Sequence, residues 1–439
     1  MTDIPKTVRE VLSALEAAGH EAWCVGGCVR DRLLGREPGD WDVTTSALPE
    51  ATMAVFGKRA FPTGLQHGTV TVRTADGAVE VTTYRLDGNY RDHRRPDSVT
   101  FTRSLSEDLR RRDFTVNAMA MDLRGELCDP FGGQEDLKRG VLRCVGEPDL
   151  RFQEDALRIL RGLRFASVLG LGIAPDTAAA IHRNRDLLRA IAAERIQAEL
   201  LKLLVGNGAA AVLRAYPDVL GVFWPEVLPM VGFGQRNAHH IYNVWEHTLH
   251  ALDAVPGDAV LRVTMLLHDI GKPRCFTVDA AGVGHFYGHA DVSRELADGM
   301  LRRLKCATEF RETVVRLVAW HDRDIPRTDR GLRRALRALG ETDLRRLIAV
   351  KRADNLAQAP EFRTMQAEID RGESILDSLL AADACCSLKQ LAVNGRDLTE
   401  LGLKGFAIGN MLNALLDAVV DGDLENNRDT LLRYAEERR

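Results

Sequence analysis

The stretch from Gly26 to Asp42, GGCVRDRLLGREPGDWD, constrains the fold of this chain more than any other. A predicted strand, AWCV, runs into a Gly-Gly turn, and a short basic helix is predicted over residues 29–34. A second turn, EPGD, leads into another predicted strand, WDVTT, which carries Asp40 and Asp42 to its start. Two strands and a helix in so few residues predict an α+β domain in this part of the chain.

The two aspartates of this stretch suggest a metal site. Alternate residues of a strand share a face, so the spacing predicts that Asp40 and Asp42 point the same way. Such carboxylates can share one or two Mg²⁺ ions, which in-line nucleotidyl transfer requires. Gly26 and Gly27 lack a Cβ, so backbone N–H groups can approach phosphate oxygens. The alternative is a surface turn with two solvated aspartates, but Gly-Gly, Arg-Asp and DxD in this order favour phosphoryl transfer.

The series GG-x-VRD-x-LLG…DWDVTT resembles the signature of the class II tRNA nucleotidyltransferases, the CCA-adding enzymes, and of their relatives the bacterial poly(A) polymerases. The resemblance implies an α+β, polymerase-β-like nucleotidyltransferase head with a small mixed sheet, followed by all-α neck, body, HD and tail domains. It implies tRNA, CTP and ATP as partners and Mg²⁺ bound by Asp40 and Asp42. Gly26, Gly27 and Arg30 would then bind the nucleotide.

A third carboxylate lies in the next part of the chain. Two alternating runs, GTVTVRT and AVEVTTYR, flank Ala-Asp-Gly, which predicts a hairpin. Glu80 lies on its second strand, and from the residues alone it is an exposed strand glutamate. Because the family pattern E-x-T-T-[FY]-R fits here, the resemblance implies that Glu80 completes the catalytic set. Residues 86–101, rich in Arg and turn formers, predict a mobile loop, which in the family helps the change from C to A addition.

The second strong match is EDLRRRDFTVNAMA, residues 107–120. A carboxylate can accept from a ribose hydroxyl, and a guanidinium supplies paired donors to phosphate. The resemblance implies that Asp113 and Asn117 bind the sugar and that Arg112 binds the triphosphate. The alternative is a basic helix start with Asp113 as its N-cap.

From residue 150 onward the pattern becomes helical. Asp155 and Arg158 stand three residues apart, which predicts an acceptor and a donor fork side by side on one helix; such a pair is usually a salt bridge. In the family, however, the motif E-D-x-x-R reads the incoming base, and G or U would turn an exocyclic carbonyl toward the Asp acceptor. The resemblance also implies that Arg161 and Arg164 bind the nucleotide.

A further predicted helix, residues 192–204, carries Arg195 and Glu199 four residues apart, which we interpret as a scaffold pair. Between Lys138 and Lys202 there are 12 Lys/Arg against 8 Asp/Glu, an excess that fits a neck along an RNA backbone. The whole chain has a net charge of −4, so any nucleic-acid surface must be local.

A different signal follows the Gly- and Pro-rich residues 206–238. Imidazoles and carboxylates recur at the ends of predicted helices, in an order that resembles the HD phosphohydrolase superfamily, with HDIGK as its most recognisable element. Ligands of these types suit several divalent metals, so the sequence predicts a metal site of unknown ion and nuclearity. A lone helical histidine is more often a core residue. The implied ligands are His247, His268, Asp269, His289, His321 and Asp354.

These patterns divide the chain into a head over 1–135, a neck and start of the body over 136–236, an HD domain over 237–360 and a helical, tRNA-binding tail over 361–439. No run approaches a membrane span and no secretory leader is evident, so we expect a cytoplasmic protein without membrane contact; no protein partner is predicted. The resemblance implies a CCA-adding enzyme with an accessory phosphohydrolase. A poly(A) polymerase, or an HD phosphohydrolase with an RNA-binding head, are the alternatives.

Overall fold

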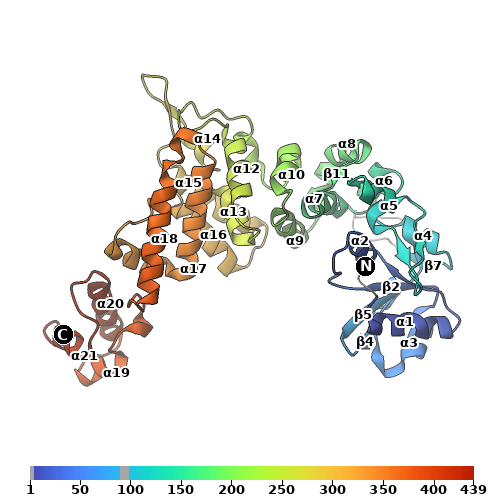
Figure 1. Ribbon diagram of the computed structural model, residues 1–439, viewed down its shortest axis with the longest axis horizontal. Coiled ribbons are helices and arrows are strands. Elements are labelled where there is room, and N and C mark those ends of the chain that lie inside the picture. Colours follow the sequence, from blue (N-terminus) through green and yellow to red (C-terminus); the bar gives the residue numbers. More distant parts are fainter. Residues whose placement is uncertain (1–3, 89–97) are drawn as a thin grey trace. The chain divides into compact units, whose positions relative to one another are not determined.

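The structure, a computed structural model, describes residues 4–88 and 98–439, and its chain divides into two compact units, residues 1–228 and 229–439. The first unit contains a sheet of seven strands in the order β3-β4-β5-β2-β1-β8-β9. Figure 1 labels β2, β4 and β5 of this sheet. The strands are β1 (Ala22–Val25), β2 (Asp42–Thr45), β3 (Ala60–Gly64), β4 (Thr69–Thr74), β5 (Gly77–Thr83), β8 (Ala120–Met121) and β9 (Leu127–Cys128). Only β2 and β5 pair in parallel, so the sheet is mixed, as predicted.

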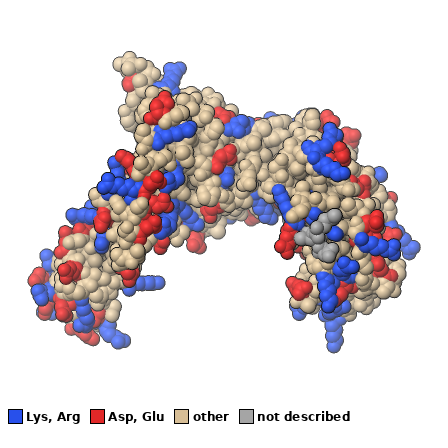
Figure 2. All heavy atoms as spheres, in the orientation of Figure 1, with Lys and Arg blue, Asp and Glu red and all other residues tan. Residues whose placement is uncertain are grey.

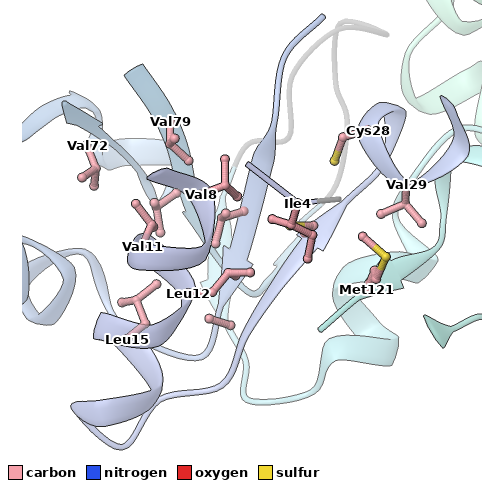
Figure 3. Packing of buried hydrophobic residues seen from close by; sticks show 14 of the residues in the cluster. Ile4, Val8, Val11, Leu12, Leu15, Cys28, Val29, Val72, Val79 and Met121 are labelled. Atoms are coloured by element: carbon pink, nitrogen blue, oxygen red, sulfur yellow. The ribbon is translucent and has the colours of Figure 1, made fainter. Parts of the chain in front are cut away.

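Helices cover both faces of this sheet because its strands alternate. Cys24 belongs to a core cluster with α1 and α3, whereas its neighbour Val25 packs with Leu105 and Leu109 of α4. Figure 3 shows Val8, Val11, Leu12 and Leu15 of α1 directed at strand residues in the first cluster. The helices of the head are α1 (Lys6–Ala17), α2 (Gly27–Leu33), α3 (Pro49–Phe56), α4 (Leu105–Arg110) and α5 (Gly133–Lys138), with 3₁₀ turns η1 (Gly57–Arg59), η2 (Leu65–His67) and η3 (Thr115–Asn117).

The predicted hairpin is confirmed, since β4 and β5 pair antiparallel around the turn before Gly77. The ends of the predicted loop form a small sheet of their own, β6 (Arg85–Asp87) with β7 (Val99–Phe101). The rest of the predicted mobile loop, residues 89–97, lies outside the described residues.

The remainder of the first unit is mostly helical. Its amphipathic helices bury leucine and isoleucine stripes against one another, as in the contact of α7 with α9. The elements are β10 (Val141–Leu142), α6 (Pro148–Glu154), α7 (Leu157–Leu169), β11 (Gly172–Ile173), α8 (Pro175–Asn184), η4 (Arg185–Ala190), α9 (Ala193–Leu204), α10 (Ala209–Ala215), α11 (Pro217–Leu220) and η5 (Pro225–Met230), which reaches the start of the second unit.

The second unit consists of helices and one short hairpin. Its cores are separate clusters, one around α17 and α18 and one within α19 to α21. The elements are α12 (Val244–Ala254), α13 (Ala259–Leu267), α14 (Lys272–Cys275), β12 (Thr277–Val278), β13 (Gly284–His285), α15 (His289–Arg303), α16 (Thr308–Trp320), α17 (Asp329–Leu356), η6 (Pro360–Met365), α18 (Gln366–Ala381), η7 (Leu388–Gln390), α19 (Gly395–Glu400), α20 (Phe406–Val420) and α21 (Arg428–Glu436).

Charged side chains of both signs are interspersed on the face of each unit drawn in Figure 2, in keeping with the small net charge. Among the described residues there is no helix with the length and apolarity that crossing a bilayer requires.

Candidate functional sites

The acidic residues of the head meet at the pairing of β2 with β5. Asp42 and Glu80 are register partners in this parallel pair. Val43 and Val81, the next residues along, both point into the core cluster under α1 and α3. Because side chains alternate along a strand, Asp42 and Glu80 together point to the opposite face, where both are exposed to solvent. The sheet therefore brings two of the three predicted carboxylates side by side.

Asp40 lies outside the strand, because β2 begins at Asp42. The predicted strand WDVTT was one residue too long at its start, and strand alternation does not orient Asp40, which lies two residues before β2. Asp40 is nevertheless close enough to influence Asp42. Partial desolvation by the surrounding protein raises the pKa of Asp42 to about 6, and the negative charge of Asp40 adds to this rise. A cation placed among these carboxylates would relieve the repulsion, so an all-oxygen donor set here fits Mg²⁺.

Arg112 supplies positive charge to the same site, and Gly26 packs against it. Gly26 has φ 82° and precedes the first residue of α2, and a Cβ at this position would lie 2.8 Å from Nη1 of Arg112. The guanidinium therefore packs where only glycine leaves room. Burial lowers the pKa of Arg112, and within the described part of the chain its buried Nε has no hydrogen-bond partner. A partly buried cation whose buried Nε is an unused donor is suited to an anionic ligand such as phosphate.

Asp113 lies at the centre of a hydrogen-bond network rather than at the start of a helix. Its Oδ2 accepts from Nε and Nη2 of Arg161 at 2.8 and 2.6 Å, and its Oδ1 accepts from Asn117 at 3.1 Å. Asn117 in turn accepts from Arg30 at 2.7 Å. Burial would raise the pKa of Asp113, but Arg161 and Asn117 outweigh it and hold this pKa at about 2. Four predicted nucleotide-binding residues are thus joined, with Asp113 ionised.

Phe165 is a part of this site that the sequence did not reveal. The guanidinium carbons of Arg30, Arg161 and Arg164 lie 5.2, 5.4 and 3.9 Å from the centre of its ring. Phe114 supports the ring edge-on, with centroids 5.9 Å apart. Cations are attracted to the face of an aromatic ring, so this one buried side chain holds three cationic candidates together. In the sequence it was only another apolar residue of a helix.

The predicted pairing of Asp155 and Arg158 on one helix is wrong. Residues 150–169 are not one helix, because α6 ends at Glu154 and Asp155 is extended, with φ −134° and ψ 103°. Asp155 accepts from the backbone N–H of Leu157 at 3.1 Å and from Arg195 at 3.3 Å. This local cap and the distant arginine compete successfully with helix continuation.

Arg158 has other partners. Its guanidinium donates to Glu154 at 2.5 Å and to the backbone carbonyl of Arg111 at 3.0 Å, which links the neck to the head segment beside Arg112. The predicted pair Arg195–Glu199 is also replaced, since Glu199 accepts from Arg164 at 2.5 Å. The scaffold interpretation of α9 holds, but each of its charges supports a nucleotide-binding candidate instead of the other.

The second unit brings the six predicted HD ligands together in two groups. His247, His268 and Asp354 form one, and Asp269, His289 and His321 the other, each with its ligand atoms within 4.8 Å of one another. Among the described residues only these groups are so closely set, and the head carboxylates are not. Asp269 faces both groups, with Oδ2 3.3 Å from His268 Nε2 and Oδ1 3.5 Å from His289 Nε2. The imidazole and carboxylate atoms of the two groups would hold divalent metal.

The four histidines share one orientation. In each, Nδ1 lies within hydrogen-bond distance of a backbone carbonyl, at 3.3 Å for His247, 2.6 Å for His268, 2.9 Å for His289 and 2.6 Å for His321. An Nδ1–H donor leaves the Nε2 lone pair free to bind a metal, which is the usual arrangement of ligating histidines. The buried Nε2 of His268 has no hydrogen-bond partner among the residues described, as expected for a metal-ligand atom.

The electrostatics of the HD centre also favour cations. Burial opposes ionisation of Asp269 and Asp354, yet nearby histidines hold the pKa of both carboxyls well below its ordinary value, and Lys272 also lowers that of Asp269. The same carboxylates raise the pKa of His268 against the effect of burial. Nζ of Lys272 lies 2.7 Å from Oδ2 of Asp269. Lys272 was not predicted as a site residue, although it is the last residue of the HDIGK motif.

Comparison with known families assigns the head site and the HD site to different families. Sequence models match the poly A polymerase head domain at residues 22–143, a "probable RNA and SrmB- binding site of polymerase A" at 170–216 and the HD domain at 237–359. A mixed sheet presenting carboxylates, a helical RNA-binding segment and an HD domain define a nucleotidyltransferase of the poly(A) polymerase type.

Individual relatives narrow this class. The CCA-adding enzyme of Geobacillus thermodenitrificans is 55% identical over 203 residues, 46% of this chain, and this match spans about half the length of that relative. That of Lactobacillus helveticus is 34% identical over 97% of this chain and 96% of its own. The crystal structure of the Bacillus stearothermophilus CCA-adding enzyme in complex with CTP aligns over 99% of this chain and 97% of its own, at 32% identity and a TM-score of 0.72. The chain belongs to the family of CCA-adding enzymes.

Proposed function

We propose that this protein adds or repairs the 3′-terminal CCA of tRNA, using CTP and ATP and releasing pyrophosphate. The observation that carries the proposal is the convergence of Asp42 and Glu80, register partners on one face, with Arg112, whose charge reaches Asp42. The similarity over the full chain to a CCA-adding enzyme that was crystallised with CTP supports it. Since tRNA and nucleoside triphosphates are cytoplasmic, we place the protein in the cytoplasm.

In this reaction the 3′-oxygen of the tRNA attacks the α-phosphorus of CTP or ATP, and the bond to pyrophosphate breaks. Asp40, Asp42 and Glu80 would hold Mg²⁺, which offsets triphosphate charge and activates the hydroxyl. Arg112 and the amides after Gly26 bind the triphosphate, and Asp113 with Asn117 receives the ribose. Asp155 and Arg158 read the base edge, once Arg158 turns from Glu154 toward the nucleotide.

The experiment offers tRNAs that end before CCA, at C and at CC, together with CTP, ATP or both, and measures product length. We expect growth to CCA and no further; a long A tail would instead identify a poly(A) polymerase. Asp42→Asn should abolish incorporation while tRNA binding persists. The matched control Asp76→Asn changes an exposed aspartate at the hairpin turn of the same sheet and should leave turnover unchanged. Normal turnover in Asp42→Asn would refute the assignment.

We propose a second activity, metal-dependent phosphate-ester hydrolysis, for the HD domain. It is supported by the two ligand groups, since Asp269 of the second group also lies 3.3 Å from Nε2 of His268 in the first. Divalent metal held by these residues would polarise a phosphate ester toward attack by water. Lys272, paired with Asp269 and buried, lines the same pocket and can balance phosphate charge. The identity of the ions follows from none of these contacts, because imidazole and carboxylate ligands suit several divalent metals.

A further inference from the structure

The pocket of the HD centre is lined both by the proposed metal ligands and by aromatic side chains. A cavity of about 310 Å³ is lined by the ligands Asp269, His289 and His321 and also by His285, Phe286 and Tyr287. The aromatic residues come from β13 and the segment that connects it to α15, immediately before the ligand His289. A molecule whose phosphate reaches the ligands can therefore place its remainder beside these rings.

Two of these rings lie parallel to each other. His285 and Tyr287 stack with centroids 5.2 Å apart and an angle of only 7° between their planes. Tyr287 is 77% exposed, whereas its neighbour Phe286 is engaged with Phe276 at 5.4 Å. An aromatic ring that is supported on one face and open on the other can accept a further planar group by stacking.

The aromatic surface is fixed in position relative to the metal ligands. The backbone N–H of Gly284 donates to the carbonyl of Arg236 at 2.8 Å, and a Cβ on Gly284 would lie 2.2 Å from the carbonyl oxygen of Gln235. The carbonyl of Phe286 accepts from Nδ1 of His289 at 2.9 Å. One short segment thus orients a metal ligand and presents Tyr287, so little conformational entropy is lost when a ligand binds.

The size and polarity of the pocket fit a single nucleotide. A volume of about 310 Å³ is at the lower end of the range for small-molecule sites, and Tyr287 extends the surface outside it. Lys272 supplies positive charge near the ligands. His240 also lines the pocket, and its buried Nδ1 has no hydrogen-bond partner among the described residues, so it can bond a sugar or base.

We propose that His285 and Tyr287 form a nucleobase-stacking platform, through which the HD centre selects phosphate esters of nucleosides over phosphate esters without a base. This inference rests on the proposed phosphohydrolase function. In that reaction water adds to the phosphorus, the ester P–O bond breaks, and the nucleoside leaves with a proton while inorganic phosphate is released. Stacking holds the base and takes no part in the bond changes, so Tyr287 is a specificity residue.

The test compares hydrolysis of adenosine 2′-, 3′- and 5′-monophosphate with that of ribose 5-phosphate by the full chain loaded with Mn²⁺. We expect Tyr287→Ala to raise the KM of the preferred nucleotide about tenfold, as loss of one stacked base would, without changing the KM of ribose 5-phosphate. Tyr287→Trp should restore the nucleotide KM. As matched control, Phe406→Ala removes an aromatic side chain that is 94% exposed and lies outside this pocket. Equal effects on both substrate types, or none on the nucleotide, would overturn the platform.

A second measurement separates failure of the platform from failure of the hydrolase. If no ester is hydrolysed, 8-azidoadenosine 5′-monophosphate is photocrosslinked to the Mn²⁺-loaded chain, and the tryptic peptide of residues 275–294 is analysed by mass spectrometry. If this peptide is labelled in the wild type and not in Tyr287→Ala, the stacking platform is supported and the phosphohydrolase proposal is refuted. Equal labelling of wild type and Tyr287→Ala, or absence of label from this peptide, would overturn the platform. Nucleotide bound at the head labels other peptides and does not interfere.

Discussion

Phe165 shows how much one apolar side chain can contribute to a polar site. Three guanidinium groups around one ring repel each other, and the ring face and the acceptors Asn117, Asp113 and Glu199 offset that repulsion. The nucleotide that we propose to bind here would therefore meet cations that are already oriented, so that little reorganisation accompanies binding.

Replacing Phe165 with Leu should weaken nucleotide binding more than it slows the chemical step. Loss of about 1–2 kcal/mol of cation–π attraction corresponds to a KM for CTP and ATP raised about five- to thirtyfold. Steady-state kinetics of CMP and AMP addition measure this, with kcat expected to change by less than KM.

The control for Phe165 is Phe152→Leu, which changes a fully buried phenylalanine of α6. Within the described residues no guanidinium lies over the ring of Phe152, so this variant should lower stability by about 1 kcal/mol and leave KM unchanged. Equal changes of KM in the two variants would show that packing alone, and not the cationic cluster, explains the effect.

At the level of elements, the break between α6 and α7 is the main difference from the sequence-based expectation. A 3.6-residue pattern detects which residues face a core, and it runs on through residues 150–169. It cannot detect that the carboxylate of Asp155 caps Leu157 or that Arg195, 40 residues away, binds the same carboxylate. The break frees Asp155 from a helix surface, and it separates the two residues that we propose read the base.

Asp155→Asn should therefore change base selection. The amide of Asn offers a donor as well as an acceptor, so it can meet the O4 carbonyl of uracil, which Asp cannot. We expect the ratio of UMP to CMP incorporation on tRNA lacking CCA to rise about tenfold in single-nucleotide assays. Asp149→Asn, near the start of α6 in an exposed pair with Arg183, should leave the ratio unchanged. Unaltered rejection of UTP by Asp155→Asn would refute the role of Asp155 in base reading.

Strands were easier to predict than the ion pairs. Alternation in β4 and β5 and the Asp-Gly turn identified the hairpin, with Glu80 exposed on its second strand, from neighbouring residues alone. The exact start of β2, and with it the position of Asp40, depends on the turn before it and was missed. Phe165 and the partners of Arg195 and Glu199 are set by contacts between distant segments, for which one sequence contains no local signal.

At the scale of the whole molecule, the two candidate sites lie in two compact units, with the head carboxylates in residues 1–228 and the HD ligands in residues 229–439. Each site is built from residues of its own unit. The family resemblance assigned the two sets of residues to separate parts of the chain, whereas composition, with its small net charge, gave no such indication.

The two activities should be separable by mutation. His268→Ala combined with Asp269→Ala removes one ligand from each group, so phosphate-ester hydrolysis should fall to background while CCA addition persists. Activity assays and Mn²⁺ titration of the full chain measure both. His250→Ala, which removes an exposed histidine of α12 outside either ligand group, serves as control. Failure of CCA addition in a double variant that still folds would contradict two independent sites.

The HD ligands come from five helices: His247 from α12, His268 and Asp269 from the end of α13, His289 from α15, His321 from the end of α16, and Asp354 from α17. Ions bound there would join segments that are more than 100 residues apart in sequence, as His247 and Asp354 are. A ligand that binds only the folded state adds its binding free energy to folding. The unfolding temperature of this helical bundle should therefore rise with the concentration of free divalent metal around the molecule.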